Sequence, residues 1–386
     1  MKKMKKLLSL LVVATMVASM LTGCGNSKET TTWKIGGIGP ATGDYAQYGL
    51  GVKNAIQIAV DEINEDGGIN GVQIEYRFED DETDNEKSVN AYNTLKDWGM
   101  NILIGSVTSG CSIAVSGKTS QDHMFQITPS ASSVDAIKND NVFQVCFTDP
   151  NQGTGAAAYI GDNNMATKVA VIYDSSDVYS SGIYEKFALE AANQPYEIVA
   201  TEAFTKDSKT DFTVQLKKAQ EAGADLVFLP IYYTEAALIL SQAKTMGYAP
   251  TFFGCDGMDG ILTGVEGFDT SLAEGVILLT PFAADARDER TQAFVKKYEE
   301  RYGETPNQFA ADAYDAVYIV KAAIEESGAT PADGVSGICD KLVKKMPELK
   351  YDGITGEGMT WSATGEVNKN AKAMVIKNGA YSLIQN

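Results

Sequence analysis

The chain has 386 residues, of which 44% are hydrophobic and 22% charged, with 36 glycines and 10 prolines. This is a globular composition, and the length allows two domains that each bury a core. The formal net charge of -19 argues against partners that are themselves acidic, so the protein is a poor candidate for binding nucleic acid or for direct adhesion to anionic lipid.

The amino terminus has the pattern of a secretory signal. Lysines at positions 2, 3, 5 and 6 precede an apolar run over 7–20 that is too short to span a membrane. The run ends in Leu-Thr-Gly-Cys24, which resembles the bacterial lipobox. We therefore predict a lipoprotein signal peptide over 1–23, lipid attachment at Cys24 and a polar tether over 24–32.

From residue 33 onward, strand and helix patterns alternate. In the first part, strands are expected at 33–39, 72–78, 102–105, 124–127 and 142–145. Helices are expected after Gly49, with Val52, Ile56, Ala59 and Ile63 on one face and a stop at Gly67-Gly68, and from about 86 to 98. The pattern restarts after Asp149-Pro150, with strands at 169–173, 197–202, 226–229, 251–253 and 276–279, and helices at 153–161, 179–192, 210–222 and 234–246. Two successive sets of this kind predict an α/β protein with two similar lobes built on parallel sheets.

Two of the apolar runs, 102–105 and 124–127, open into small hydroxyl residues. The sequence Ser-Val-Thr-Ser occupies 106–109, and Thr-Pro-Ser-Ala-Ser-Ser occupies 128–133. Ligands of open α/β sheets bind outside the carboxyl ends of the strands, and hydroxyl groups beside a helix N-terminus suit a carboxylate. Two ordinary strand-to-helix turns with N-caps are the alternative interpretation.

The sequence offers little for catalysis or metal binding. The remaining cysteines, Cys111, Cys146, Cys255 and Cys339, are widely spaced, so buried free thiols are expected rather than a zinc site or a disulfide scaffold. His123 is the only histidine, and it precedes a strand where a surface turn is expected. No GxSxG, GxGxxG or Walker A motif is present. We predict no enzyme activity, no cofactor and no metal.

Several motifs together resemble the branched-chain amino acid binding proteins of ABC importers. These are Gly39-Pro-Ala-Thr-Gly, Ala46-Gln-Tyr-Gly, Ile63-Asn-Glu-Asp-Gly-Gly-Ile-Asn-Gly, Thr128-Pro-Ser-Ala-Ser, Thr210-Asp-Phe and Ala313-Tyr-Asp-Ala. The resemblance implies a type I periplasmic binding fold, in which two doubly wound parallel-sheet lobes are joined by a three-crossover hinge. The first lobe would comprise 33–150 and 281–355, and the second 151–280 and 356–386. The third crossover would fall at 351–356, and helices in the first lobe at 287–302, 308–327 and 334–345.

The resemblance also implies a ligand site. The α-carboxylate contacts of the family fall on Ser109, Ser130, Ala131 and Ser132, and the ammonium contacts on Tyr179, Tyr232 and Asp256. Tyr48 and Tyr232 would form aromatic walls around the ligand side chain. Two departures stand out: Asp256 replaces the usual glutamate, and Thr83 and Thr108 occupy the positions of a disulfide that family members often carry.

The function implied is that of an extracytoplasmic solute-binding protein. It would be anchored by its lipid to the outer face of the bacterial cell membrane, act as a monomer, close around a free branched-chain or other apolar amino acid, and deliver it to an ABC permease. Two alternatives remain open at this point. One is a ligand-sensing lipoprotein that acts on a membrane receptor, and the other is a binder of amides or other small solutes in the same fold.

Overall fold

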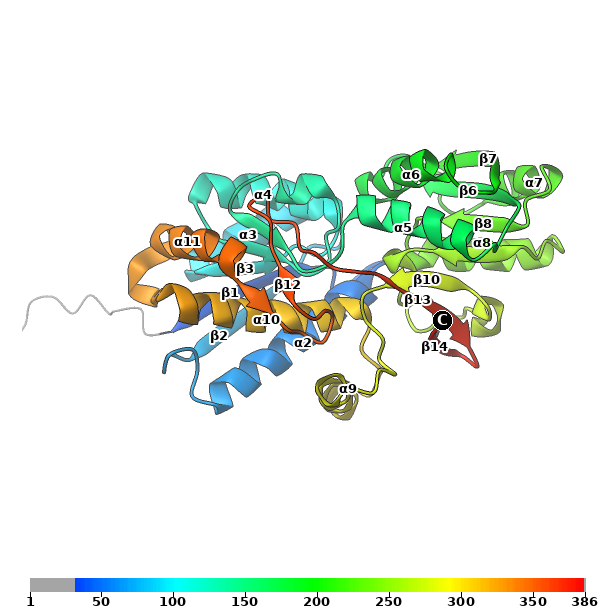
Figure 1. Ribbon diagram of the computed structural model, residues 1–386. Coiled ribbons are helices and arrows are strands. Elements are labelled where there is room, and N and C mark those ends of the chain that lie inside the picture. The colour runs from blue at the N-terminus through cyan, green and yellow to red at the C-terminus, as the bar shows by residue number, and fades with distance from the viewer. Residues whose placement is uncertain (1–31, 385–386) are drawn as a thin grey trace, which may run out of the picture. The chain divides into compact units, whose positions relative to one another are not determined.

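The computed structural model describes residues 32–384, which form one compact unit (Figure 1). The predicted signal peptide, the lipidation site Cys24 and the tether up to residue 31 lie outside the described residues. Within the described part, no helix is both long enough and apolar enough to cross a membrane.

The first sheet is entirely parallel, with strand order β2-β1-β3-β4-β5. Its strands are β1 (Trp33–Gly39), β2 (Ile74–Asp80), β3 (Ile102–Gly105), β4 (Gln126–Thr128) and β5 (Val142–Gln144). The helices of this lobe are α2 (Ala46–Glu65), α3 (Asn85–Trp98), α4 (Ser109–Asp122), α9 (Glu289–Tyr302), α10 (Gln308–Ser327) and α11 (Gly334–Lys345). We call this sheet with these helices the first lobe.

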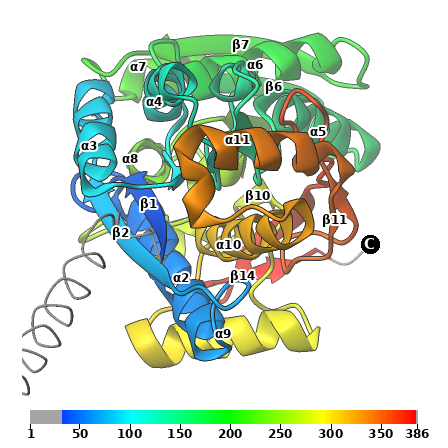
Figure 2. The same ribbon diagram turned by 90° about the vertical axis from the view of Figure 1, so that its left-hand side faces the viewer.

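Alternating side chains of the buried strands supply cores on both faces of the first sheet. Ile102 and Ile104 belong to the cluster that includes α2 and α10, whereas Leu103 joins the cluster under α3 and α4. Figure 2 shows α10 beside α2, and the two helices pack closely along their lengths. The carboxyl-terminal helices therefore complete a lobe whose strands all come from the first part of the chain.

The second sheet has the order β14-β13-β10-β9-β8-β6-β7. Its strands are β6 (Lys168–Asp174), β7 (Glu197–Phe204), β8 (Leu226–Leu229), β9 (Thr251–Gly254), β10 (Ile277–Thr280), β13 (Lys372–Lys377) and β14 (Ala380–Leu383). Its helices are α5 (Asp149–Asp162), α6 (Val178–Ala191), α7 (Thr213–Glu221) and α8 (Tyr233–Thr245). These elements form the second lobe. The last two strands are antiparallel additions at the edge, since β13 pairs antiparallel with β10.

The third crossover lies further along the chain than the expected 351–356. A small ribbon, β11 (Lys350–Tyr351) paired with β12 (Met359–Thr360), follows α11. The indole N–H of Trp361 then donates to the Gln144 carbonyl oxygen at 2.7 Å, and Gln144 N–H donates to the Gly365 carbonyl at 3.0 Å. Because the buried indole needs an acceptor, it holds this stretch on β5 of the first lobe. The chain joins the second sheet only at Lys372.

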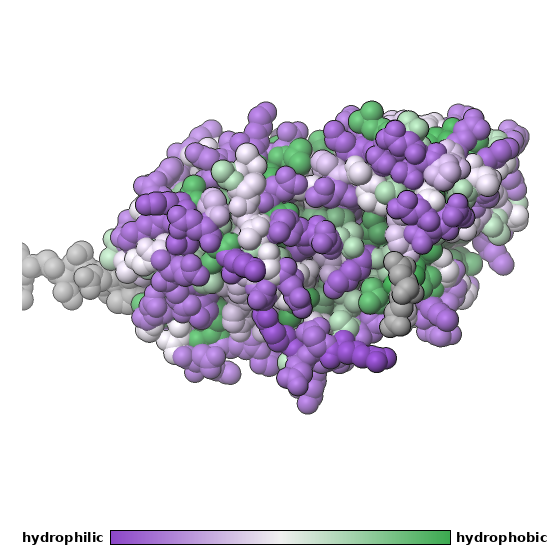
Figure 3. All heavy atoms as spheres, in the orientation of Figure 1, coloured by the Kyte–Doolittle hydropathy of each residue, from purple (hydrophilic) through white to green (hydrophobic). Residues whose placement is uncertain are grey.

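Several local expectations are confirmed. The four cysteines Cys111, Cys146, Cys255 and Cys339 are free and buried. His123 ends α4 in a left-handed conformation and is exposed. Thr83 and Thr108 both have buried hydroxyl oxygens without a hydrogen-bond partner. Figure 3 shows that hydrophilic residues cover most of the face seen in Figure 1.

Candidate functional site

A small cavity lies between the two lobes. It is lined by Tyr48, Val107, Thr108, Ser109, Ser130, Ser132, Tyr179, Tyr232, Asp256, Gly257 and Phe309. Every residue predicted for the ligand site is in this group except Ala131, which is buried in the adjoining turn.

The first lobe contributes hydroxyl groups and the N-terminus of a helix. Ser109 is the first residue of α4, and Thr108, the N-cap, makes no side-chain capping bond. The unpaired N–H groups of a first helical turn carry partial positive charge and favour an anion. The Ala131 N–H is not available in the same way, because it donates to the Thr128 hydroxyl oxygen at 2.9 Å. Ala131 therefore shapes the turn that presents Ser130 and Ser132.

The second lobe contributes a buried carboxylate. Asp256 lies in a short 3₁₀ turn, Asp256–Met258, directly after β9, and is 2% exposed. Its Oδ1 accepts from the Tyr179 hydroxyl at 2.7 Å and its Oδ2 from the Gln152 amide at 2.9 Å. Burial raises the pKa of Asp256 to about 7, although both hydrogen bonds favour the charged form. No lysine or arginine in the described range 32–384 forms an ion pair with it.

The carboxyl groups nearest to Asp256 bring no positive charge to this end of the cavity, since Asp149 and Asp312 both interact with it as acids. Both oxygens of the Asp149 carboxyl are buried without a hydrogen-bond partner, and burial raises its pKa well above the ordinary value. Burial likewise raises the pKa of Asp177 to about 6. An uncompensated buried carboxylate is costly, whereas a carboxylate paired with a cation is not. This end of the cavity is therefore suited to an ammonium group.

Aromatic rings form the remaining wall. The rings of Tyr179 and Tyr232 stack with centroids 4.9 Å apart, and Tyr48 meets Phe309 edge-on at 4.7 Å. The hydroxyl groups of the wall are already engaged: Tyr48 donates to the Gly257 carbonyl oxygen, and Tyr179 donates to Asp256. The rings therefore offer apolar surface to whatever occupies the cavity.

The sequence interpretation missed five residues of the site: Val107, Thr108, Gln152, Gly257 and Phe309. Phe309 comes from α10, far along the chain, and its position in an apolar helix pattern gave no sign of a ligand role. Gly257 could have been found from the sequence, because it directly follows Asp256, which was already assigned to the ligand site. A Cβ at Gly257 would lie 2.6 Å from the Tyr179 hydroxyl oxygen, so only glycine fits without displacement.

Comparison with known proteins agrees with this architecture. The family model described as "Periplasmic binding protein" matches residues 32–380. The Leu/Ile/Val-binding protein BraC3 of Rhizobium johnstonii is 30% identical over 319 residues, covering 82% of this chain and 84% of the relative. A Pseudomonas aeruginosa protein named for binding leucine, isoleucine, valine, threonine and alanine is 27% identical, covering 87% of this chain and 88% of its own.

Solved structures show the same fold. The branched-chain amino acid transporter substrate binding protein LivJ of Streptococcus pneumoniae, in complex with isoleucine, has a TM-score of 0.82 and 30% identity, covering 92% of this chain and 99% of that one. A leucine binding protein, LivK, of Thermotoga maritima has a TM-score of 0.80 and 25% identity, covering 92% and 98%. The chain therefore belongs to the periplasmic binding protein family and has its type I fold.

Proposed function

We propose that this protein is the extracytoplasmic solute-binding component of an ABC importer and binds a free amino acid with a branched or other small apolar side chain. One observation carries the proposal. The cavity has hydroxyl groups and a helix N-terminus at one end, and at the other a buried carboxylate, Asp256, without a cationic side chain. An α-amino acid, whose ammonium and carboxylate groups are attached to the same carbon, complements both ends.

In the proposed complex, the ligand carboxylate accepts hydrogen bonds from Ser109, Ser130 and Ser132. The ammonium group pairs with Asp256, and the ring of Tyr232 adds a cation-π contribution. The side chain packs against Tyr48 and Phe309. Because this wall is apolar, leucine, isoleucine and valine should differ in binding free energy by only about 1–3 kcal/mol per methylene-sized change.

The names of the relatives support this ligand class. The homologous proteins of Rhizobium and Pseudomonas are named for branched-chain amino acids, and the LivJ structure holds isoleucine. Binding needs no chemical step, since closure around the ligand creates the conformation that a permease recognises. We further propose that the protein acts as a monomer and that lipid on Cys24 holds it at the outer face of the bacterial cell membrane, where several acyl chains anchor firmly.

The test is a thermal-shift screen of protein that begins at Asn26, which keeps the whole compact unit. The protein is unfolded and refolded to remove carried-over ligand and then mixed with the twenty amino acids, amides, sugars and short peptides. A ligand at 100 times its dissociation constant adds about 2.7 kcal/mol of stability.

A shift with leucine, isoleucine and valine supports the proposal. A shift confined to amides or other solutes contradicts the ligand class but keeps a binding role. If vesicles or membrane fractions retain the full-length protein but not a Cys24→Ser variant, the result supports the proposed lipid anchor.

A further inference from the structure

At the mouth of the cleft, outside the cavity, side chains of the two lobes meet in one polar cluster. We call Asp44, Tyr45, Lys209, Thr234 and Glu235 the clamp. The Tyr45 hydroxyl donates to Glu235 Oε1 at 2.6 Å, and Lys209 Nζ donates to Asp44 Oδ2 at 2.8 Å. The Thr234 hydroxyl donates to the Asp44 carbonyl oxygen at 2.8 Å.

The clamp joins the lobes because its members come from both. Asp44 and Tyr45 immediately precede α2 of the first lobe, whereas Thr234 and Glu235 lie in the first turn of α8 of the second. Lys209 precedes α7 of the second lobe. The bonds made by Asp44 and Tyr45 therefore exist only while the cleft is closed.

The contact between Tyr45 and Glu235 is protected from water. The Glu235 side chain is only 4% exposed, and Lys209, at 27%, lies 3.3 Å from its Oε1 and compensates its charge. A hydrogen bond to a charged group in such surroundings contributes more than an ion pair on the open surface. The outer pair, Lys209 with Asp44, is weaker, since the Asp44 side chain is 60% exposed.

The clamp also contacts the wall of the cavity. The rings of Tyr45 and Tyr232 lie 4.7 Å apart between centroids, and Tyr232 lines the cavity. Lys209 Nζ lies 5.0 Å above the Tyr45 ring. A ligand that leaves must part Tyr45 from Tyr232, and this movement breaks the hydrogen bond of Tyr45 to Glu235.

We propose that Tyr45, Lys209 and Glu235 hold the two lobes closed and thereby set the rate at which ligand leaves. They are positioning residues, since none of them lines the cavity. The ligand part of this inference rests on the proposed function. Because ligand enters the open cleft, where the clamp is not formed, its association rate does not depend on these bonds, whereas dissociation requires them to break.

The first experiment measures association and dissociation rates of L-leucine by stopped flow for protein beginning at Asn26. Tyr45→Phe should raise the dissociation rate about 10- to 100-fold, the change expected for losing a hydrogen bond to a charged group, with the association rate unchanged. Lys209→Met should raise it by a smaller factor. The melting temperature without ligand should fall no further than in the single-lobe control Tyr92→Phe, which separates this role from a merely structural one.

Matched controls break equivalent bonds inside one lobe. Tyr92→Phe removes a hydroxyl that donates to Asp122 at 2.9 Å within the first lobe. Lys218→Met breaks the pair of Lys218 with Glu202, 2.8 Å apart within the second lobe. Neither control should change the dissociation rate.

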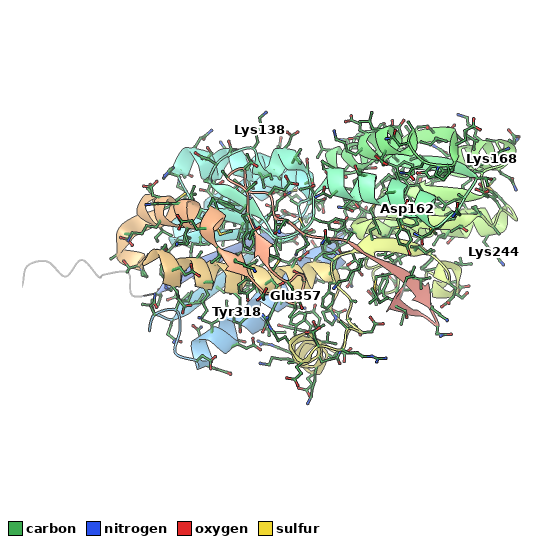
Figure 4. The ribbon with its side chains drawn as sticks, in the orientation of Figure 1. Lys138, Asp162, Lys168, Lys244, Tyr318 and Glu357 are labelled. Carbon is green, nitrogen blue, oxygen red and sulfur yellow. The ribbon has the colours of Figure 1, made fainter. Side chains whose placement is uncertain are left out.

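The second experiment needs no ligand. Lys138 and Lys244 are exposed and point outward from the first and second lobes, respectively (Figure 4). Spin labels on cysteines introduced at these two positions report the interlobe distance by pulsed EPR. Tyr45→Phe should shift the distances to longer values than in the parent and in Tyr92→Phe, either without ligand or with leucine.

The two experiments separate the two ideas. If neither leucine nor any other amino acid binds, and Tyr45→Phe still lengthens the distances, the proposed ligand is wrong and the clamp stands. If Tyr45→Phe and Lys209→Met match their controls in both dissociation rate and distance, the clamp is refuted.

Discussion

Replacing Asp256 by asparagine should make the protein more stable and its ligand binding weaker. The carboxylate is buried, and burial raises its pKa from the ordinary 3.8 to about 7. In the pH range between these values the folded protein retains a proton that the unfolded chain has lost. Stability without ligand therefore falls as pH rises through this range and is lowest above pH 7.

The size of this effect follows from the shift. A difference of about three pKa units corresponds to about 4 kcal/mol at pH 8. Asparagine removes this cost, since it has no charge to bury, and it still accepts the hydrogen bond from Tyr179. Part of the gain is lost because the Asp256 bond with Gln152 must rearrange. We expect a net increase in unfolding free energy at pH 8 and little change at pH 4.

Binding should respond in the opposite direction. The ammonium group of the ligand would be left without its carboxylate, which costs about 2–5 kcal/mol. Unfolding in urea at pH 4 and pH 8 measures stability, and calorimetric titration with L-leucine at pH 8 measures binding. Asp162→Asn, which removes the same charge from an exposed position, is the control and should change neither. An Asp256→Asn protein that binds leucine like the parent, or is less stable at pH 8, would refute this reasoning.

Three other substitutions probe the site and the hinge. Ser109→Ala should weaken leucine binding by about 1.5–3 kcal/mol through a lost hydrogen bond to a charged group; unchanged affinity in calorimetry would remove Ser109 from the carboxylate site. Gly257→Ala should abolish detectable leucine binding, because its methyl group would lie 2.6 Å from the Tyr179 hydroxyl oxygen; a crystal structure with an undisturbed Tyr179 would contradict this. Lys369→Met should lower the unfolding free energy by about 3–5 kcal/mol, because Lys369 pairs at 2.6 Å with Asp312, both side chains are 1% exposed, and the change leaves the Asp312 charge buried without a partner. Adding Asp312→Leu should restore part of this loss. Urea titrations that show no such recovery would exclude an uncompensated charge as the cause.

The secondary structure could be predicted because its causes are local. The apolar face of α2, with Val52, Ile56, Ala59 and Ile63 all buried, is visible in the spacing of these residues. Strands such as Ile102–Gly105 are short apolar runs bounded by turn residues. Some boundaries shifted by a few residues, as at the first turn of α7, which begins at Thr213 rather than residue 210.

Part of the candidate site has a local signal in the sequence. Ser109 lies shortly after β3 of the first sheet and Asp256 shortly after β9 of the second, and ligands of open α/β sheets bind outside the carboxyl ends of the strands. Their roles toward a ligand were assigned through the resemblance to a family. Tyr48, Tyr179 and Tyr232 were assigned through the resemblance to a family, since a single tyrosine carries no local signal for a ligand role.

The sequence by itself determined the α/β class, the two sets of parallel strands and the hydroxyl turns, because periodicity and turn chemistry act over a few neighbouring residues. The tertiary structure alone decided that Phe309 lines the cavity and that Gln152 donates to Asp256. It also decided that Trp361 holds the chain on the first lobe before the third crossover, and that Tyr45 meets Glu235 across the cleft. These contacts join residues far apart in the chain, and their partners are chosen by how the lobes pack and close, which no local pattern encodes.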